Sequence, residues 1–191
     1  MKNTILATTL ISAFISQPLL AQDDPFTYLD FSFSAANASN LESNEYGSIK
    51  GSMSLHENIY MGAEYTSDWH GDDYNYGFTI GLKNQLYTTD GATHFSFAEY
   101  TWKDYQVHDA DEQWDFSSHN YKLGVASDFG ALATKLYVGY YDHDWQKYDE
   151  NWVVGAEAYY KVTDTVSFGL TGESGTDLEG AKVGIGLRVS F

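Results

Sequence analysis

Histidine and carboxylate residues occur together at three places in this 191-residue chain. The three groups are His70 with Asp72 and Asp73, His108 with Asp109, Asp111 and Glu112, and His143 with Asp144. Imidazole and carboxylate groups bind divalent transition metals, so loops that carry these groups could together hold an ion. Their spacing matches no dedicated metal motif, and the acidic pattern is not that of an EF-hand loop. Because acidic runs of one sign usually keep a loop solvated, we predict no metal site and no cofactor.

A serine-histidine cluster is the second place where chemistry is conceivable. Ser117 and Ser118 directly precede His119. A hydrolytic site is defined by the geometry of a nucleophile, a base and the group that orients the base, and adjacency in sequence does not supply that geometry. No nucleophile motif surrounds these residues. We therefore predict no catalytic residue and no enzyme, and a hydrolase at the rim of the fold is the third choice of function.

The elements that carry these residues are strands. Ten segments alternate apolar residues with small or polar ones, which is the period of a β-strand with one apolar and one polar face. The alternation shifts phase between Phe97 and Tyr100, which suggests a β-bulge there. The predicted strands cover residues 26–35, 46–55, 59–68, 74–83, 93–102, 116–126, 131–141, 151–162, 166–174 and 181–191.

The connections between these segments are alternately short and long, and the long ones are acidic. This arrangement indicates an up-and-down antiparallel sheet, with the short turns at one end and the long loops at the other. Because the number of strands is even, both termini of the sheet should lie at the short-turn end.

The polar face of the predicted sheet is rich in Gly and Ser and carries isolated charged residues. Lys103 and Lys147 lie outside the predicted strands and are therefore assigned to loops, not to this face. A lipocalin-like barrel would turn its apolar face inward, but a polar face in water has no need for so much Gly. A narrow lumen does, because small residues leave space in which a few long charged side chains can pair. The predicted lumen charges are Asp30, Lys50, Glu64, Lys83, Lys122, Lys135, Glu157, Lys161, Glu173, Lys182 and Arg188.

The apolar face suits a membrane. Its aromatic residues gather at strand ends near the long connections, as in a girdle at a membrane interface. In hydrocarbon only a closed barrel pairs every backbone group of a sheet, and strands of about 9–11 residues are long enough to cross when tilted. The predicted girdle consists of Tyr65, Trp69, Tyr74, Tyr76, Trp102, Tyr140 and Trp152.

Residues 1–21 have the features of a secretory signal peptide. Lys2 is followed by an apolar stretch over Ile5–Ile15, and cleavage is expected after Ala21. The chain contains no Cys, so an exported protein must do without disulfides. The formal net charge of −17 excludes nucleic acid as a partner, because phosphate binding needs a basic surface.

The signal peptide, the hairpin pattern and the terminal aromatic residue together resemble the small outer-membrane β-barrel proteins of Gram-negative bacteria, the class that includes OmpX and the membrane domain of OmpA. The resemblance covers nearly the whole chain. It implies an all-β, up-and-down antiparallel transmembrane β-barrel of about ten strands, with eight as the alternative, that forms one domain over residues 22–191. It also implies that the barrel-assembly machinery reads the last strand through Val183, Ile185, Leu187, Val189 and Phe191.

This architecture does not fix a role, because the class includes adhesins, pores, enzymes and structural members. A barrel of about ten strands is close to the size that side chains fill. We predict a structural or surface-interaction protein of the cell outer membrane, with a side-chain-filled lumen. Its partners would be outer-membrane lipid, lipopolysaccharide and an unknown extracellular ligand. The alternative is a narrow porin-like channel, with a positive constriction formed by Lys83, Lys135, Lys161 and Arg188 behind an acidic mouth.

Overall fold

A computed structural model describes residues 24–36, 44–69, 73–89, 91–109, 112–144, 151–175 and 181–191. The predicted signal peptide and its cleavage site lie outside these residues. Within the described part of the chain, no helix is long and apolar enough to cross a membrane.

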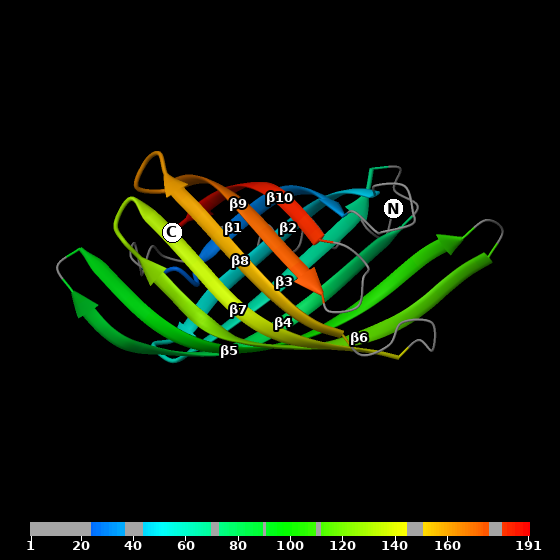
Figure 1. Ribbon diagram of the computed structural model, residues 1–191, viewed down its shortest axis with the longest axis horizontal. Helices are drawn as coiled ribbons and strands as arrows, with labels where there is room; N and C mark the ends of the chain where they lie inside the picture. Colours follow the sequence, from blue (N-terminus) through cyan, green and yellow to red (C-terminus); the bar gives the residue numbers. More distant parts are fainter. Residues whose placement is uncertain are drawn as a thin grey trace.

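Ten antiparallel strands form one closed barrel (Figure 1). Each strand pairs with its neighbours in the chain, and the first strand pairs with the last, which closes the sheet. The predicted ten-stranded up-and-down barrel is therefore confirmed, and the eight-stranded alternative is wrong. The strands are β1 (Tyr28–Ala36), β2 (Asn44–His56), β3 (Ile59–Asp68), β4 (Tyr74–Thr89), β5 (Ala92–Asp109), β6 (Glu112–Asp128), β7 (Leu132–His143), β8 (Asn151–Lys161), β9 (Val166–Gly175) and β10 (Ala181–Ser190).

Strands β5 and β6 are longer than their sequences suggest, with 18 and 17 residues, and their hairpin projects beyond its neighbours (Figure 1). Lys103 lies within β5, directly opposite Gly77 on β4 and Ser118 on β6, so its assignment to a loop was wrong. Backbone pairing does not require an apolar face, so the two strands continue where the alternation of side chains has faded. The length of this hairpin could not be read from hydrophobicity alone.

The suspected bulge lies on a different strand. The register between β4 and β5 shifts between Gln85 and Tyr87 of β4, whereas β5 itself alternates regularly against β6. Phe95 and Phe97 of β5 are buried inside the barrel, although the apolar face was predicted to point outward. The apparent change of phase in the sequence arises because the lumen accepts aromatic rings at these two positions.

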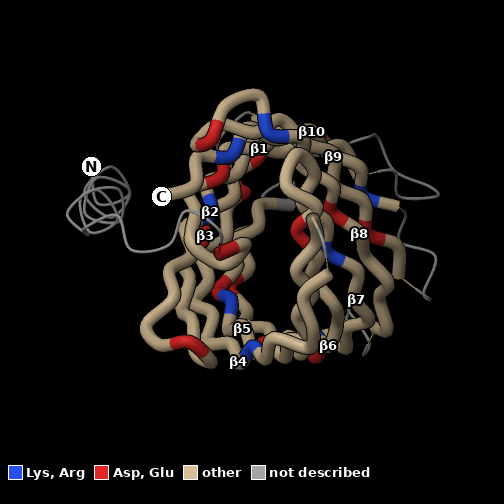
Figure 2. The backbone as a smooth tube through the Cα atoms, turned by 90° about the vertical axis from the view of Figure 1, so that its left-hand side faces the viewer, with Lys and Arg blue, Asp and Glu red and all other residues tan. Residues whose placement is uncertain are grey.

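The outer face of the barrel is covered by exposed apolar side chains. They include Met61, Phe78, Ile80, Leu82, Leu123, Val125, Leu136, Val138, Val154, Phe168, Leu170, Val183 and Ile185. A lipocalin-like arrangement, with the apolar face inside, is thereby excluded. Figure 2 shows basic and acidic positions close together on neighbouring strands, and the buried charged residues include Asp30, Lys83, Glu99, Lys135 and Arg188.

Candidate functional site

A row of alternating charges crosses neighbouring strands inside the barrel. Arg188 of β10 stands directly opposite Asp30 of β1, which stands opposite Lys50 of β2, which in turn stands opposite Glu64 of β3. Opposite charges at paired positions of adjacent strands attract one another. The row continues past Gly77 of β4 to Lys103 of β5, and the Lys103 ammonium forms an ion pair with Glu64 across the glycine. A Cβ atom at this glycine would lie 3.0 Å from the Lys103 side chain, so the missing side chain leaves room for the pair.

Arg188 is the most constrained charge of the lumen. Its Nε donates to Asp30 over 3.0 Å, and its NH2 group donates to Glu157 of β8 over 2.9 Å. The guanidinium carbon also lies 4.0 Å from the ring centre of Tyr28 and 3.6 Å from that of Tyr159. Both carboxylates and both rings are thus held by one side chain, in the geometry that a planar guanidinium fits and an ammonium does not.

A plug formed by residues 24–27 fills the short-turn end of the lumen. Phe26 is 0% exposed. Its ring packs against Tyr60 with a centre-to-centre distance of 4.5 Å, and against Phe95 and Phe97 at 5.9 Å each. Asp24 accepts a 3.0 Å hydrogen bond from the Phe26 backbone N–H. Phe26 was predicted to begin a strand and Asp24 had no predicted role, so the plug was not foreseen from the sequence.

Lysines hold this plug from the surrounding wall. Lys83 forms an ion pair with Asp24, and its ammonium lies 5.2 Å from the centre of the Phe26 ring. The Lys135 ammonium lies 4.6 Å from the same ring centre and 5.3 Å from that of Tyr28. Cations over aromatic faces are attracted by the ring quadrupole, by about 0.5–2 kcal/mol each.

Aromatic rings and cations therefore alternate through the closed half of the barrel, from Tyr159 to Lys83. We call this sequence of side chains the cation–aromatic column. It consists of Tyr159, Arg188, Tyr28, Lys135, Phe26 and Lys83. Beside it, the Tyr60 hydroxyl donates to the buried carboxylate of Glu99 over 2.8 Å. Glu99 was also missed, because the misread phase of β5 hid its inward direction.

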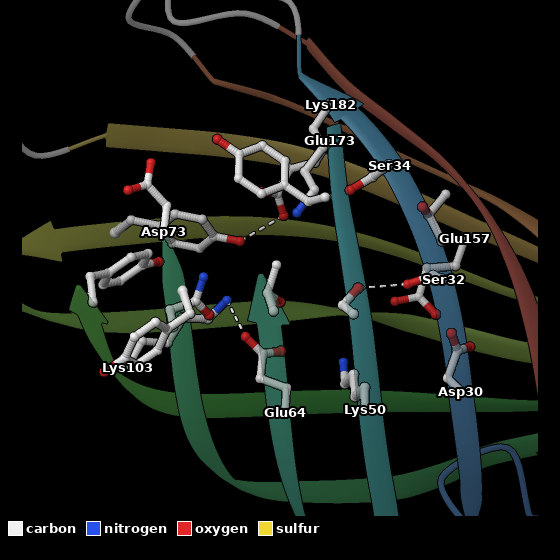
Figure 3. Close-up of a pocket in the computed structure, with 18 of the residues that line it drawn as sticks. Asp30, Ser32, Ser34, Lys50, Glu64, Asp73, Lys103, Glu157, Glu173 and Lys182 are labelled. Carbon is white, nitrogen blue, oxygen red and sulfur yellow. Dashed lines mark hydrogen bonds and ion pairs between the residues drawn. The ribbon is translucent and has the colours of Figure 1, made fainter. Parts of the chain in front are cut away.

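The other half of the lumen is hollow. A cavity of about 470 Å³ lies at the end with the longer connections, and its walls come from most of the strands (Figure 3). Two members of the column, Tyr159 and Arg188, also line this cavity, as do Asp30 and Glu157, the carboxylates that bond to Arg188. The prediction of a filled lumen therefore describes the short-turn half and does not describe this half.

Glu173 of β9 is a centre of hydrogen bonding in the cavity. Its Oε2 accepts from Tyr137 over 2.7 Å and from Tyr141 over 2.6 Å, and the Lys122 ammonium lies 3.5 Å away (Figure 3). The two tyrosines and the lysine stand on the adjoining strands β6 and β7, so this carboxylate joins three strands around one atom. Such a fully engaged oxygen fixes the positions of the side chains around it.

Of the eleven predicted lumen charges, ten lie in the cavity, the charge row or the column. Lys161 lies at the short-turn rim instead, where its ammonium is 2.9 Å from Asp128. Lys182 lines the cavity near Tyr46, with its ammonium 5.6 Å from the ring centre. No sequence signal identified Asp128 as a partner, because it stands at the end of a strand next to a turn.

The His-carboxylate groups are only partly described. His70, Asp72 and Asp111 lie outside the described residues, as do the side chains of Asp109 and Glu112. Asp73 accepts a 2.7 Å hydrogen bond from the His108 backbone N–H, and the His108 Nδ1 is 3.9 Å from the same carboxylate oxygen. His143 lines the cavity wall. Within the described residues, no group of three or more potential ligands is arranged to hold a metal ion.

The serine-histidine cluster is split between the two faces of β6. Ser118 is 0% exposed, inside the barrel. His119, on the opposite face, has its Nδ1 within 2.8 Å of the Tyr100 hydroxyl. Because adjacent residues of a strand point to opposite faces, Ser118 and His119 cannot act together, whereas Ser117 shares the face of His119.

The predicted aromatic girdle forms ring pairs near the longer connections. The pairs are Tyr65 with Tyr74, Tyr76 with Trp102, Tyr140 with Trp152, and Trp69 with Phe33, at centre distances of 6.2, 5.9, 5.3 and 5.9 Å. Contacts between neighbouring rings of this kind add to the stability of a sheet.

Comparison with known proteins finds similar structures but no match in sequence. No family model matches the chain, and no curated protein matches it. Among solved structures it is similar to the KdgM porin, with 7% identity, a TM-score of 0.47, and coverage of 86% of this chain and 99% of that one. It is also similar to the NanC porin, with 11% identity, a TM-score of 0.47, and coverage of 85% and 98%.

A third likeness is to outer membrane phospholipase A from Escherichia coli, with 15% identity, a TM-score of 0.44, and coverage of 95% of this chain and 97% of that one. The neighbours thus include porins and an enzyme. At these identities no functional residue is transferred to this chain, and its role has to be argued from its own side chains.

Proposed function

We propose that this chain is an outer-membrane β-barrel with a structural or surface-interaction role, closed towards the short-turn end and open as a polar cup towards the outside. The exposed apolar side chains on the outer face support the membrane location, because in water they would form a very large apolar surface. Polar groups inside and apolar groups outside is the arrangement of transmembrane barrels.

The plug of residues 24–27 is the observation that best supports a lumen closed at the short-turn end. Phe26 is fully buried among Tyr60, Phe95 and Phe97, and its ring is flanked by two ammonium groups. Behind it, Arg188 fills the section between Tyr28 and Tyr159. Two successive layers of packed side chains thus separate the cavity from the short-turn end. A narrow porin-like channel would need both layers to move.

A pair of cysteine variants tests this proposal, since the natural chain has no Cys to interfere. Ser48 and Ser54 both point inward from β2, but Ser48 lines the cavity and Ser54 bonds to Asp24 of the plug. Intact cells expressing Ser48→Cys or Ser54→Cys would be treated with a membrane-impermeant maleimide. We expect rapid labelling of Ser48→Cys and none of Ser54→Cys.

Two results would contradict the proposal. Equal labelling of both variants would mean that the lumen is open, and failure to label Ser48→Cys would mean that the cup does not face outward. Whether the lumen is closed can also be tested by measuring the conductance of the refolded mature protein in a planar bilayer. Steady steps that change with Lys83→Ala would favour the channel alternative.

The partners in this proposal follow from the location. The outer face would contact membrane lipid and lipopolysaccharide, and the last strand, with Phe191 at its end, would be the part that the barrel-assembly machinery reads. The aromatic pairs near the longer connections support this orientation, because Trp and Tyr prefer membrane interfaces.

A further inference from the structure

The charges of the cavity are not all matched by partners. Lys103 pairs with Glu64, Lys122 with Glu173, and Arg188 with Asp30 and Glu157. Lys182 also lines the cavity, yet its ammonium forms no ion pair or hydrogen bond with any described residue. Glu173, which stands opposite Lys182 on β9, is already engaged by Tyr137, Tyr141 and Lys122, so the cavity offers this cation to an incoming group.

A hydroxyl group close to Lys182 also has no partner in the part of the chain that the structure describes. Ser34 of β1 lines the cavity and is 8% exposed, and its buried Oγ has no hydrogen-bond partner among the described residues. Ser34 stands opposite Tyr46 and Gly184, and Lys182 is the next inward residue of β10 beyond that glycine (Figure 3). A buried hydroxyl without a partner costs free energy, and a bound polar molecule could satisfy it.

The rest of this wall consists of hydroxyl groups. Ser32 and Ser48 face each other at 2.8 Å, and Thr66 and Thr171 line the cavity on either side of them. Hydroxyls can donate or accept, so they suit a ligand that carries hydroxyl groups of its own. The volume of about 470 Å³ lies within the range of small-molecule sites.

We propose that this cavity binds a small carboxylate that carries hydroxyl groups, with the carboxylate at Lys182 and with Ser34 bonded to the ligand. The acidic net charge of the chain does not prevent this, because exposed charges more than about 8 Å away are largely screened at physiological ionic strength. The inference rests on the proposed function, since it needs the cup to be open to the outside.

Gluconate and sorbitol are matched probes for this site, since they have the same carbon chain and differ in the carboxylate. Titration calorimetry on the refolded protein in detergent micelles should show saturable binding of gluconate, and binding of sorbitol at least about 10-fold weaker, the factor that about 1.4 kcal/mol produces. Lys182→Gln and Ser34→Ala should each weaken gluconate binding several-fold. Lys161→Gln is the control, because Lys161 pairs with Asp128 at the other end of the barrel, and it should leave binding unchanged.

A heat-dependent gel shift establishes that each variant is folded before it is titrated. Equal binding of sorbitol and gluconate, unchanged gluconate binding in Lys182→Gln and Ser34→Ala, or absence of gluconate binding would each overturn the inference. None of these results would disturb the closed barrel, which the cysteine labelling tests separately. Equal labelling of the two cysteine variants, in turn, would contradict the closed cup even where gluconate binds.

Discussion

Replacing Arg188 with Met should destabilise the barrel severely, because it leaves Asp30 and Glu157 as unpaired carboxylates inside the lumen. Removing one partner of a buried ion pair costs about 3–5 kcal/mol. The lost stacking on Tyr28 and Tyr159 adds about 0.5–2 kcal/mol for each ring. Since these contributions are not independent, we expect a total loss of about 4–6 kcal/mol in the free energy of unfolding.

The assay is urea unfolding in lipid vesicles, followed by tryptophan fluorescence, with the heat-dependent gel shift as a second measure of the folded fraction. The triple variant Arg188→Met, Asp30→Asn, Glu157→Gln should regain a large part of the loss, because it removes the unpaired charges together with the cation. Lys182→Met is the control. It removes a cation with no ion pair among the described residues, so it should change stability by less than about 1 kcal/mol.

A loss below about 1 kcal/mol in Arg188→Met would refute this reasoning, since it would mean that water reaches the carboxylates and that the column does not close the lumen. A triple variant no more stable than the single one would also count against it. In that case the loss would come from packing around the two rings and not from buried charge.

Two further predictions concern single positions. Gly155→Ala should lower stability by about 1–3 kcal/mol, because the new Cβ would overlap the Tyr137 ring, which bonds to Glu173. Gly172→Ala is the control: its Cβ would meet nothing within 4 Å, so it should be neutral in the same urea titration. Equal effects of the two variants would contradict the packing described. Phe191→Ser should reduce the amount of folded barrel in cells, measured by gel shift of isolated outer membranes, while leaving refolding in detergent unchanged; a defect in both, or in neither, would argue against an assembly signal.

The strands could be predicted because each carries its own period-two pattern, and the pattern of β10 or β4 needs no knowledge of the rest of the chain. Pairing inside the lumen could not be predicted in the same way. Lys103 meets Glu64, and Lys122 meets Glu173, only because of the register of strands that are far apart in sequence. Sequence alternation assigns a side chain to a face without naming the residue opposite it.

The plug and the inward aromatic rings were missed for a different reason. The change of phase between Phe97 and Tyr100 was interpreted as a bulge and not as a sign that Phe95 and Phe97 point inward, and Phe26 was taken as part of a strand. The lumen accepts them because Gly124 leaves space beside Phe97: a Cβ there would lie 2.8 Å from the ring. The sequence contains that glycine, but nothing local connects it with a ring on the next strand.

The bond between Arg188 and Asp30 joins the last strand to the first, across 158 residues of sequence. In a sheet of ten paired strands that has not yet curled shut, this guanidinium has no access to that carboxylate, and both edges present unsatisfied backbone groups to lipid. The free energy of this bond is therefore released only in the final step of folding. An open sheet gains nothing from it, so this bond favours the closed barrel over the open one. A chain that stops before β10 therefore keeps an exposed strand edge and lacks the Arg188 partner of Asp30.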